Sequence, residues 1–457
     1  METTIAAIST AMSASGIGII RISGENAMDV ISRIYRSKGG KKKIKEVPTH
    51  TIHYGYIYDG EELIDEVLVM IMHAPRTFTG EDTVEIDCHG GVYAMQRVLD
   101  TVLKNGAEIA EPGEFTKRAF LNGRMDLSQA EAVMDVIQAK NEYAFRSSMD
   151  QLRGSVQKAI RDIREKLIYH IAYIESALDD PEHISLDGYP QELLEVVDNE
   201  QKEVKRLLKT SSDGKMIQEG IQTVILGKPN AGKSSLLNLL IGENRAIVTD
   251  IAGTTRDILE EYITLHGISL KIIDTAGIRE TKDIVEKIGV DRAREMAQKA
   301  DLILYVVDSS VPLDENDEEI MEMLTGKKAI ILYNKTDLQP EIQPEILKEK
   351  TGHPVIPISA KEEKGITELE EQIKDMFFGG EISFNDEVYI TNARHKAALE
   401  EADRSLDLVR NSIERGMPED FFSIDLMNAY ENLGKILGES VGEDLVNEIF
   451  SKFCMGK

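Results

Sequence analysis

The sequence is poor in cysteine and has no long apolar run. Its 457 residues include only two cysteines, Cys88 and Cys454, which lie far apart in the chain. This scarcity argues against a disulfide framework and suits a reducing compartment, so we expect a cytoplasmic protein. No run approaches the roughly 18 uninterrupted apolar residues of a membrane-spanning helix, which predicts a chain that does not cross a membrane.

The N-terminus lacks the features of a secretory signal. The stretch from Ile5 to Ile20 is small and apolar, but Glu2 precedes it and the first basic residue is Arg21. A signal peptide begins with positive charge, so we expect this stretch to belong to the folded protein.

Positive charge is also in deficit, because 53 lysines and arginines face 81 acidic residues and give a formal net charge of −28. At long range such a chain repels a phosphate backbone, which argues against broad binding of nucleic acid, so any RNA contact must be local or shared. Two local basic groups exist, and we interpret them as solvated segments. They are Lys38, Lys41, Lys42, Lys43 and Lys45 in one loop, and Arg146, Arg153, Lys158, Arg161, Arg164 and Lys166 along one helical region.

The most informative stretch is a glycine-rich loop from Gly227 to Ser234. It follows an apolar run, 221–226, and leads into leucines at helical spacing. In a strand, loop and helix of this kind, backbone N–H groups and the helix N-terminus can surround phosphate, Lys233 can reach the outer phosphates, and Ser234 can bind magnesium. Taken alone, the stretch could also be an ordinary tight turn.

Three further stretches follow apolar strands in the order that a GTPase requires. The first is Asp274-Thr275-Ala276-Gly277, in which the Asp274 carboxylate can hold magnesium through water and the Gly277 N–H can donate to the γ-phosphate. In Asn334-Lys335-Thr336-Asp337, the carboxylate of Asp337 can accept two hydrogen bonds from guanine, whereas adenine lacks this donor pair. The segment Ser359-Ala360-Lys361 can line the far side of the base. Together the four stretches predict a GTP hydrolase.

The segments 230–238 and Gly253-Thr254-Thr255-Arg256-Asp257 resemble the TrmE family of translation GTPases. The tail Cys454-Met455-Gly456-Lys457 is similar to that of the tRNA-modifying branch, and the resemblance covers the whole chain. It implies a GTPase that, with a flavin- and NADH-dependent partner, adds an aminomethyl or carboxymethylaminomethyl group to C5 of the wobble uridine of certain tRNAs. The alternative is a GTP-dependent ribosome-assembly or regulatory switch, although this acidic chain shows no RNA-binding signature of the KH or OB type.

The resemblance also implies the ligands of two ions. Ser234 and Thr255 would hold magnesium, and potassium would be held by Asn230, Thr249, Ile251 and Thr254 when two GTPase domains face each other in a homodimer. The implied GTP-binding residues are Asn230, Ala231, Gly232, Lys233, Ser234, Ser235, Thr249, Asp250, Ile251, Ala252, Gly253, Thr254, Thr255, Asp274, Thr275, Ala276, Gly277, Asn334, Lys335, Thr336, Asp337, Ser359, Ala360 and Lys361.

Hydrolysis needs a group that orients the attacking water. Many switch GTPases place a glutamine directly after the Asp-x-x-Gly segment, but here that position is Ile278, which cannot hydrogen-bond water. The resemblance implies that Glu286 is the catalytic residue, acting through a bridging water. Glu280 and Asp283 remain alternatives. The side chains of Arg256 and Arg279 are either cationic fingers or surface residues of the switch.

The first part of the chain predicts an α+β domain, with strands at 18–22, 67–72 and 83–87 and an amphipathic helix at 92–103. His89 has no partner at ligand spacing, and we interpret it as structural. The resemblance implies a folate-binding one-carbon domain. There Arg21, Glu81, Arg124 and the tail residue Lys457 would bind a tetrahydrofolate derivative in its 5-formyl or 5,10-methylene form. Cys454 is a nucleophile or a plain tail cysteine.

The remaining sequence predicts helices around an α/β segment. Apolar spacing from Leu152 to Leu178 predicts one long helix, and a further helix at about 191–209 should lead to a domain boundary at 211–214. Strands alternating with helices after residue 219 predict a parallel sheet. We therefore expect a multidomain protein with α+β, all-α and α/β parts. Its domains are 1–118 for folate, 119–218 and 381–457 as one helical domain, and 219–380 as an inserted Ras-like P-loop GTPase domain.

Overall fold

The computed structural model describes residues 3–39, 43–242, 261–265, 268–273, 286–378 and 388–456. By their contacts, residues Met1–Ile137, Gln151–Pro190 and Asn411–Lys457 form one compact unit, called unit 1 below, and Gln138–Asp150 and Gln191–Arg410 form unit 2. The chain thus enters each unit more than once, as expected when one part of a chain is inserted into another.

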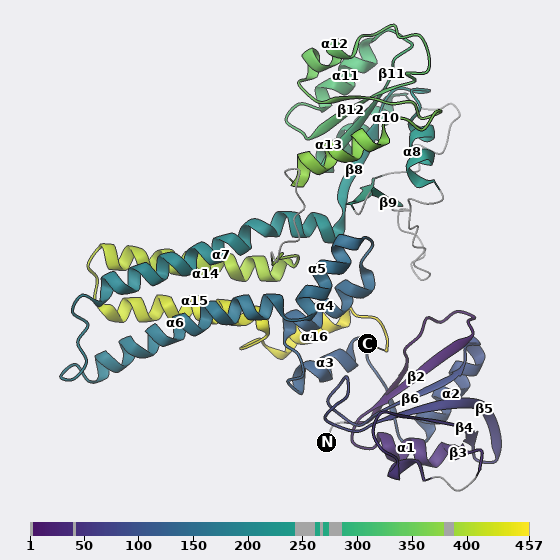
Figure 1. The fold of residues 1–457 in the computed structure, drawn as a ribbon, viewed down its shortest axis with the longest axis vertical. Helices are drawn as coiled ribbons and strands as arrows, with labels where there is room; N and C mark the ends of the chain where they lie inside the picture. Colours follow the sequence, from purple (N-terminus) through teal and green to yellow (C-terminus); the bar gives the residue numbers. More distant parts are fainter. Residues whose placement is uncertain are drawn as a thin grey trace. The chain divides into compact units, whose positions relative to one another are not determined.

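Unit 1 contains a seven-stranded sheet in the order β3-β4-β5-β6-β2-β1-β7. All neighbours pair antiparallel except β1 and β7. Helices α1 and α2 pack on one face and bury the apolar side of the strands, which confirms the α+β prediction (Figure 1). The elements are β1 (Ile5–Ile8), β2 (Ile17–Ser23), α1 (Ala27–Ile34), β3 (Tyr35–Ser37), η1 (Ile44–Glu46), β4 (Thr51–Asp59), β5 (Glu62–Met72), β6 (Thr83–His89), α2 (Val92–Lys104) and β7 (Glu108–Ile109).

The helices of unit 1 come from both ends of the chain. They are α3 (Glu114–Leu121), α4 (Leu127–Gln138), α6 (Ser155–Asp179), α15 (Glu419–Leu437) and α16 (Glu443–Ser451). Helices α6 and α15 lie side by side, and Arg164 joins them through Glu439 at 2.6 Å and the Tyr430 carbonyl oxygen at 3.2 Å. The prediction that a single helix starts at Leu152 is wrong, because Gly154 adopts a left-handed φ of 93° and α6 starts after it.

Unit 2 contains a six-stranded sheet in the order β13-β12-β11-β8-β10-β9. The first five strands of this order, from β13 to β10, pair parallel with their neighbours, as predicted. The edge strand β9 pairs antiparallel with β10. Apolar cores lie on both faces of the sheet. The elements are β8 (Ile221–Leu226), α8 (Lys233–Ile241), β9 (Glu261–Leu265), β10 (Ile268–Ile272), α10 (Glu286–Lys299), β11 (Leu302–Asp308), α11 (Glu315–Met323), β12 (Ala329–Asn334), α12 (Pro344–Thr351), β13 (Val355–Pro357) and α13 (Ile366–Phe378).

The sheet of unit 2 is inserted between two long helices, α7 (Tyr189–Glu219) and α14 (Ala393–Glu414); α5 (Glu142–Leu152) precedes them. Within unit 2, Gln201 of α7 donates to Asp407 of α14 at 2.6 Å. The predicted helix end near residue 209 is wrong, because α7 continues to β8. A Cβ atom on Gly214 would lie 2.4 Å from the Ile390 carbonyl oxygen, so this glycine permits close packing rather than ending the helix.

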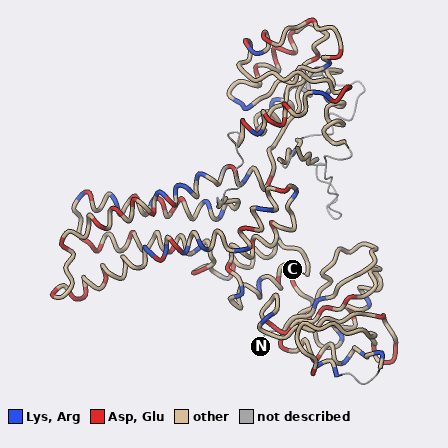
Figure 2. Tube along the Cα trace, viewed as in Figure 1, with Lys and Arg blue, Asp and Glu red and all other residues tan. Residues whose placement is uncertain are grey.

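Basic and acidic residues are interspersed along the helices (Figure 2). In the basic group predicted to be a solvated face, Arg146 pairs with Glu142 and Arg164 is buried against Glu439. The group is therefore not one continuous basic surface. Among the helices within the described ranges, none is both long and apolar enough to cross a membrane.

Candidate functional site

The glycine-rich loop connects β8 to α8, as predicted. Gly232 adopts a left-handed φ of 102°, and a Cβ atom there would lie 2.2 Å from the side-chain nitrogen of Asn334. The Lys233 ammonium donates to the carbonyl oxygens of Gly227 at 2.6 Å and Lys228 at 2.7 Å. Burial lowers the pKa of Lys233. The Lys233 side chain thus folds back onto the backbone of the loop. At position 232 the backbone leaves room only for glycine.

Asn334 joins three of the predicted stretches at the end of β12. Its buried side chain donates to the Ala231 carbonyl oxygen at 2.8 Å and accepts from the Ala360 backbone N–H at 3.1 Å. The Thr336 hydroxyl donates to the Ile358 carbonyl oxygen at 2.9 Å. The phosphate loop, the segment 334–337 and the segment 359–361 are therefore held together by direct hydrogen bonds.

Asp337 has the chemistry that base selection requires. Its Oδ1 accepts from the Ser359 hydroxyl at 2.8 Å, and this bond lowers the pKa of the carboxyl group. The carboxylate is ionised at neutral pH and acts as an acceptor only. Such a group can accept from the N1–H and exocyclic amine of guanine.

Several predicted residues lie outside the described residues. They are Thr249–Thr255, Asp274–Gly277, Ile278, Lys457, and the alternatives Arg256, Arg279, Glu280 and Asp283. Glu286 begins α10, and only its backbone is described. Of the predicted ion ligands, Ser234 lies in the first turn of α8, where a hydroxyl oxygen suits Mg²⁺, and Asn230 lies exposed in the loop with a left-handed φ of 65°.

The predicted folate residues of unit 1 form part of what we call the Phe78 cluster: Arg21, Phe78, Glu81, Arg118 and Arg124. The guanidinium carbons of Arg21 and Arg124 lie 5.6 and 5.2 Å from the centroid of the Phe78 ring, within cation–π range. Glu81 accepts from the Ser23 hydroxyl at 2.7 Å and pairs with Arg118 at 3.2 Å. The cluster therefore brings together β2, the loop between β5 and β6, α3 and the turn that follows α3.

Sequence reasoning missed two members of this cluster. Arg118 is 7% exposed and pairs with both Glu81 and Glu114. Glu114 lies one helical turn earlier, and its carboxylate is 2.8 Å from the Arg118 guanidinium. The spacing of Glu114 and Arg118 was a detectable sign of an ion pair on α3. Phe78 offered no comparable sign, because only the fold places its ring between two arginines.

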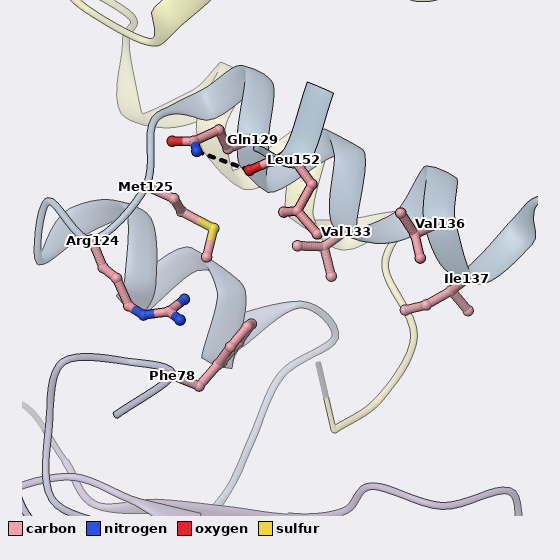
Figure 3. A pocket seen from close by; sticks show the side chains of 8 residues that line it. All are labelled: Phe78, Arg124, Met125, Gln129, Val133, Val136, Ile137 and Leu152. Atoms are coloured by element: carbon pink, nitrogen blue, oxygen red, sulfur yellow. Dashed lines mark hydrogen bonds between the residues drawn. The ribbon is translucent and has the colours of Figure 1, made fainter. Parts of the chain in front are cut away.

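A cavity of about 480 Å³ adjoins the cluster (Figure 3). Phe78 and Arg124 lie at one side of it, and the remaining lining is almost entirely apolar. Gln129 donates to the Leu152 carbonyl oxygen at 3.0 Å beside it. The structure thus brings Arg124 to the cavity, whereas Arg21 and Glu81 are not among its lining residues. Those residues are Phe78, Arg124, Met125, Gln129, Val133, Val136, Ile137 and Leu152.

The C-terminal tail packs against the N-terminal sheet within unit 1. The Gly456 carbonyl oxygen accepts from the Ser9 hydroxyl at 3.2 Å and from Arg21 at 3.4 Å. Cys454 is exposed, and its carbonyl oxygen accepts from the Gly113 N–H. Burial raises the pKa of Cys88 to about 12, so this thiol stays protonated and unreactive at neutral pH.

His89 is exposed and pairs with Asp65, whose carboxylate accepts from the ring at 2.6 Å and from the His89 backbone N–H at 2.8 Å. The hydrogen bond to Asp65 raises the pKa of His89. Among the described residues no three acidic, histidine or cysteine side chains gather as a metal site.

Comparisons with known proteins match both units. A family model described as the MnmE helical domain matches residues 127–454, and one described as the GTP-binding protein TrmE N-terminus matches residues 4–124. The tRNA modification GTPase MnmE of Lachnoclostridium phytofermentans is 60% identical over 454 residues, 99% of each chain. That of Geobacillus kaustophilus is 50% identical over 458 residues, again 99% of each chain. Among solved structures, the G domain of the FeoB iron transporter of T. maritima is 26% identical, with a TM-score of 0.27, and covers 34% of this chain and 97% of its own.

Proposed function

This chain belongs to the MnmE family of tRNA modification GTPases, and from that premise we propose that it is potassium-activated and acts with an MnmG-type FAD- and NADH-dependent partner. In this proposal the pair adds a (carboxymethyl)aminomethyl group to C5 of the wobble uridine of certain tRNAs, using the one-carbon unit of a tetrahydrofolate derivative. Residues 219–380 form the GTPase domain, 1–118 the folate domain, and 119–218 with 381–457 the helical domain.

The observation that carries the proposal is the position of Asn334. Because its side chain bonds both the phosphate loop and the segment that backs the base, the site for the phosphates and the site for the base have a fixed spacing. The ionised Asp337 selects guanine, since an adenine would leave its charge without donors. Lys233 exchanges its two carbonyl partners for phosphate oxygens, which are stronger acceptors.

Magnesium, held by Ser234 and Thr255, neutralises charge on the β- and γ-phosphates when it is bound. The first-turn position of Ser234 fits this role. Glu286 orients the attacking water through a second water, because Ile278 cannot.

Potassium would stabilise the charge that develops between the β- and γ-phosphates when two GTPase domains of a homodimer face each other. It would be held by the Asn230 side chain, the carbonyls of Thr249 and Ile251, and Thr254. The exposure of Asn230 supports this role, because the side chain is on the surface that a second chain can reach. The left-handed backbone at Asn230 also suits asparagine better than most residues.

The tetrahydrofolate derivative binds at the Phe78 cluster with Arg21, Glu81, Arg124 and Lys457. Arg124 can bind the carboxylate tail of a folate at the mouth of the apolar cavity, whose volume falls within the range of about 300–1,000 Å³ typical of ligand pockets. Arg118 pairs with Glu81 and orients its carboxylate, which can accept hydrogen bonds from a pterin edge. The ligand supplies the one-carbon unit when bound.

Loss and restoration of modified tRNA test the proposal. Deleting the gene should remove the modified wobble uridine from total tRNA, measured by mass spectrometry of nucleosides. The wild-type gene should restore it, and the Glu286→Ala gene should not. A nucleoside profile unchanged by the deletion would contradict the tRNA assignment and favour a switch GTPase of another process.

A further inference from the structure

Lys228 makes a contact that the GTPase motifs do not explain. It lies in the phosphate loop with a side chain that is 14% exposed, and its ammonium lies 2.9 Å from Asp314 and 2.6 Å from Asp317. Burial by itself lowers the pKa of Lys228, but the hydrogen bonds to Asp317 and Asp314 outweigh it and the pKa is raised. The lysine is therefore charged and engaged with both carboxylates at the N-terminus of α11.

The two carboxylates are themselves fixed. Asp317 is 1% exposed, and its Oδ1 accepts from the buried Tyr305 hydroxyl at 2.7 Å, while its Oδ2 accepts from the Asp314 backbone N–H at 3.0 Å. Asp314 caps α11 by accepting from the backbone N–H groups of Asn316 and Asp317. Because neither aspartate can move without breaking these bonds, Lys228 is attached to a fixed anchor.

The anchored residue lies where it can set the geometry of the loop. The Lys228 carbonyl oxygen is one of the two acceptors of Lys233, at 2.7 Å. Next to it, a Cβ atom on Gly227 would lie 2.5 Å from the Val306 carbonyl oxygen, so the loop is already in close contact with β11. Asp308, at the end of β11, pairs with Lys335 of the base-binding segment. The connection from β11 to α11 therefore holds the phosphate loop at one end and the base segment at the other.

We propose that Lys228 is a positioning residue that fixes the phosphate loop to α11 through Asp314 and Asp317, and that this attachment slows the release of guanine nucleotide. The inference rests on the proposed role of the loop in binding phosphate. The loop surrounds the β-phosphate, which GDP and GTP share, so the release of both nucleotides should depend on the attachment. Holding a loop in its bound geometry strengthens binding by removing the cost of ordering it.

The test compares nucleotide release in matched variants of the full chain. Lys228→Met keeps the length of the side chain and removes its charge. The dissociation rate of methylanthraniloyl-GDP should rise about tenfold, which corresponds to a typical coupling free energy between contacting residues. The KM for GTP should rise with it, while kcat should fall less than about threefold. Lys228→Arg should retain slow release. Lys299→Met, which removes an exposed pair with Glu295, is the control and should release nucleotide at the wild-type rate.

A second variant separates positioning from folding. Lys228→Met leaves Asp317 buried without a cation, which lowers the melting temperature. In Lys228→Met/Asp317→Asn that buried charge is also gone, so the melting temperature should recover while release stays fast. Release that returns to the wild-type rate in the double variant would overturn the proposal, as would a Lys228→Met release rate within about twofold of wild type, well below the expected coupling.

A Lys233→Ala variant measured in parallel shows whether the positioning role of Lys228 or the phosphate site itself is wrong. If Lys233→Ala loses nucleotide and Lys228→Met releases it at the wild-type rate, the loop binds phosphate and only the positioning role is wrong. If Lys233→Ala binds GDP as tightly as wild type, the proposed site itself is wrong.

Discussion

The nucleotide loops of unit 2 and the Phe78 cluster of unit 1 are built in opposite ways. In unit 2, two side chains of the short motifs bond to backbone: Lys233 and Asn334 both donate to carbonyl oxygens of the phosphate loop. In unit 1, side chains from distant segments bond to one another, as Arg118 does with Glu81 and Arg21 with Glu85. A site whose side chains bond to nearby backbone can be recognised in the sequence as a short motif. A site made of ion pairs between distant segments can be recognised only once the fold is known.

The largest expected effect is in the backbone-anchored site. Lys233→Ala removes two charge-assisted hydrogen bonds to phosphate, each of about 2 kcal/mol, so the GTP affinity should fall about a thousandfold. Equilibrium titration with a fluorescent GTP analogue measures it. Folate binding in unit 1 should stay unchanged. An affinity within about tenfold of wild type, the loss expected from a single weak bond, would show that the phosphates bind elsewhere.

Asp337→Asn should exchange the base preference. The amide oxygen can still accept from N1–H, but the amide N–H faces the exocyclic amine of guanine. One hydrogen bond to a charged acceptor is therefore lost, GTP affinity should fall about a hundredfold, and xanthosine triphosphate, which has an acceptor at that position, should bind better than GTP. Competition assays with both nucleotides give the ratio. Gain of ATP binding, or no change in either nucleotide, would exclude Asp337 as the base-reading residue.

The Phe78 cluster should respond to single changes more weakly and with strong coupling. Arg118→Met and Glu81→Gln should each weaken binding of 5-formyltetrahydrofolate about tenfold, and the double variant little further, because the two act as one pair. Calorimetric titration measures both. Arg97→Met, which removes a pair between α2 and Glu62 at the start of β5, away from the cluster, is the control. Additive losses from Arg118 and Glu81 would mean that the two contact ligand independently.

Acid should affect the two regions with opposite sign. Burial, with a contribution from Glu85, raises the pKa of Asp87 in the N-terminal sheet, so ionisation of Asp87 destabilises the fold at neutral pH and protonation relieves this as the pH falls. In the nucleotide region the pKa of Asp337 is lowered, so its contribution is present above about pH 4, the usual carboxyl range, and is lost as the pH falls further.

Asp87→Asn tests the unit 1 side of this contrast. The change should raise the free energy of unfolding at pH 7 by less than about 1 kcal/mol, and by nothing at pH 3, where the native carboxyl is also neutral. Denaturant unfolding at the two pH values measures it. Equal gains at both pH values would show that packing, not charge, is the cause.

The same contrast explains what sequence reasoning could predict. The phosphate loop and the segments at 334–337 and 359–361 are contiguous, and each follows a strand whose apolar run is visible, so their order alone predicted a GTPase. The bond from Asn334 to Ala231 and the attachment of Lys228 to Asp317 join residues about a hundred positions apart, and only the sheet order shows them. Phe78 was missed for the same reason, whereas the spacing of Glu114 and Arg118 was visible in the sequence.

Two errors in the predicted elements also have local causes. The stretch 211–214 was interpreted as a boundary that follows a helix, whereas Gly214 lies in α7 and permits close approach of Ile390. The break at Gly154 lies inside an apolar pattern that continues across it, so spacing alone predicted a continuous helix. In both cases the glycine had two possible roles, and only the residues packed against it decide between them.

The most direct test of the account is GTP hydrolysis in potassium and in sodium buffer at matched ionic strength. It is measured for the wild type, for Asn230→Ala and for Asn230→Gly, which removes the side chain but tolerates the left-handed backbone. We expect potassium to stimulate GTP hydrolysis strongly in the wild type and not in either variant. Equal wild-type rates in the two salts would contradict a potassium-activated GTPase and favour a switch GTPase that awaits an external activator.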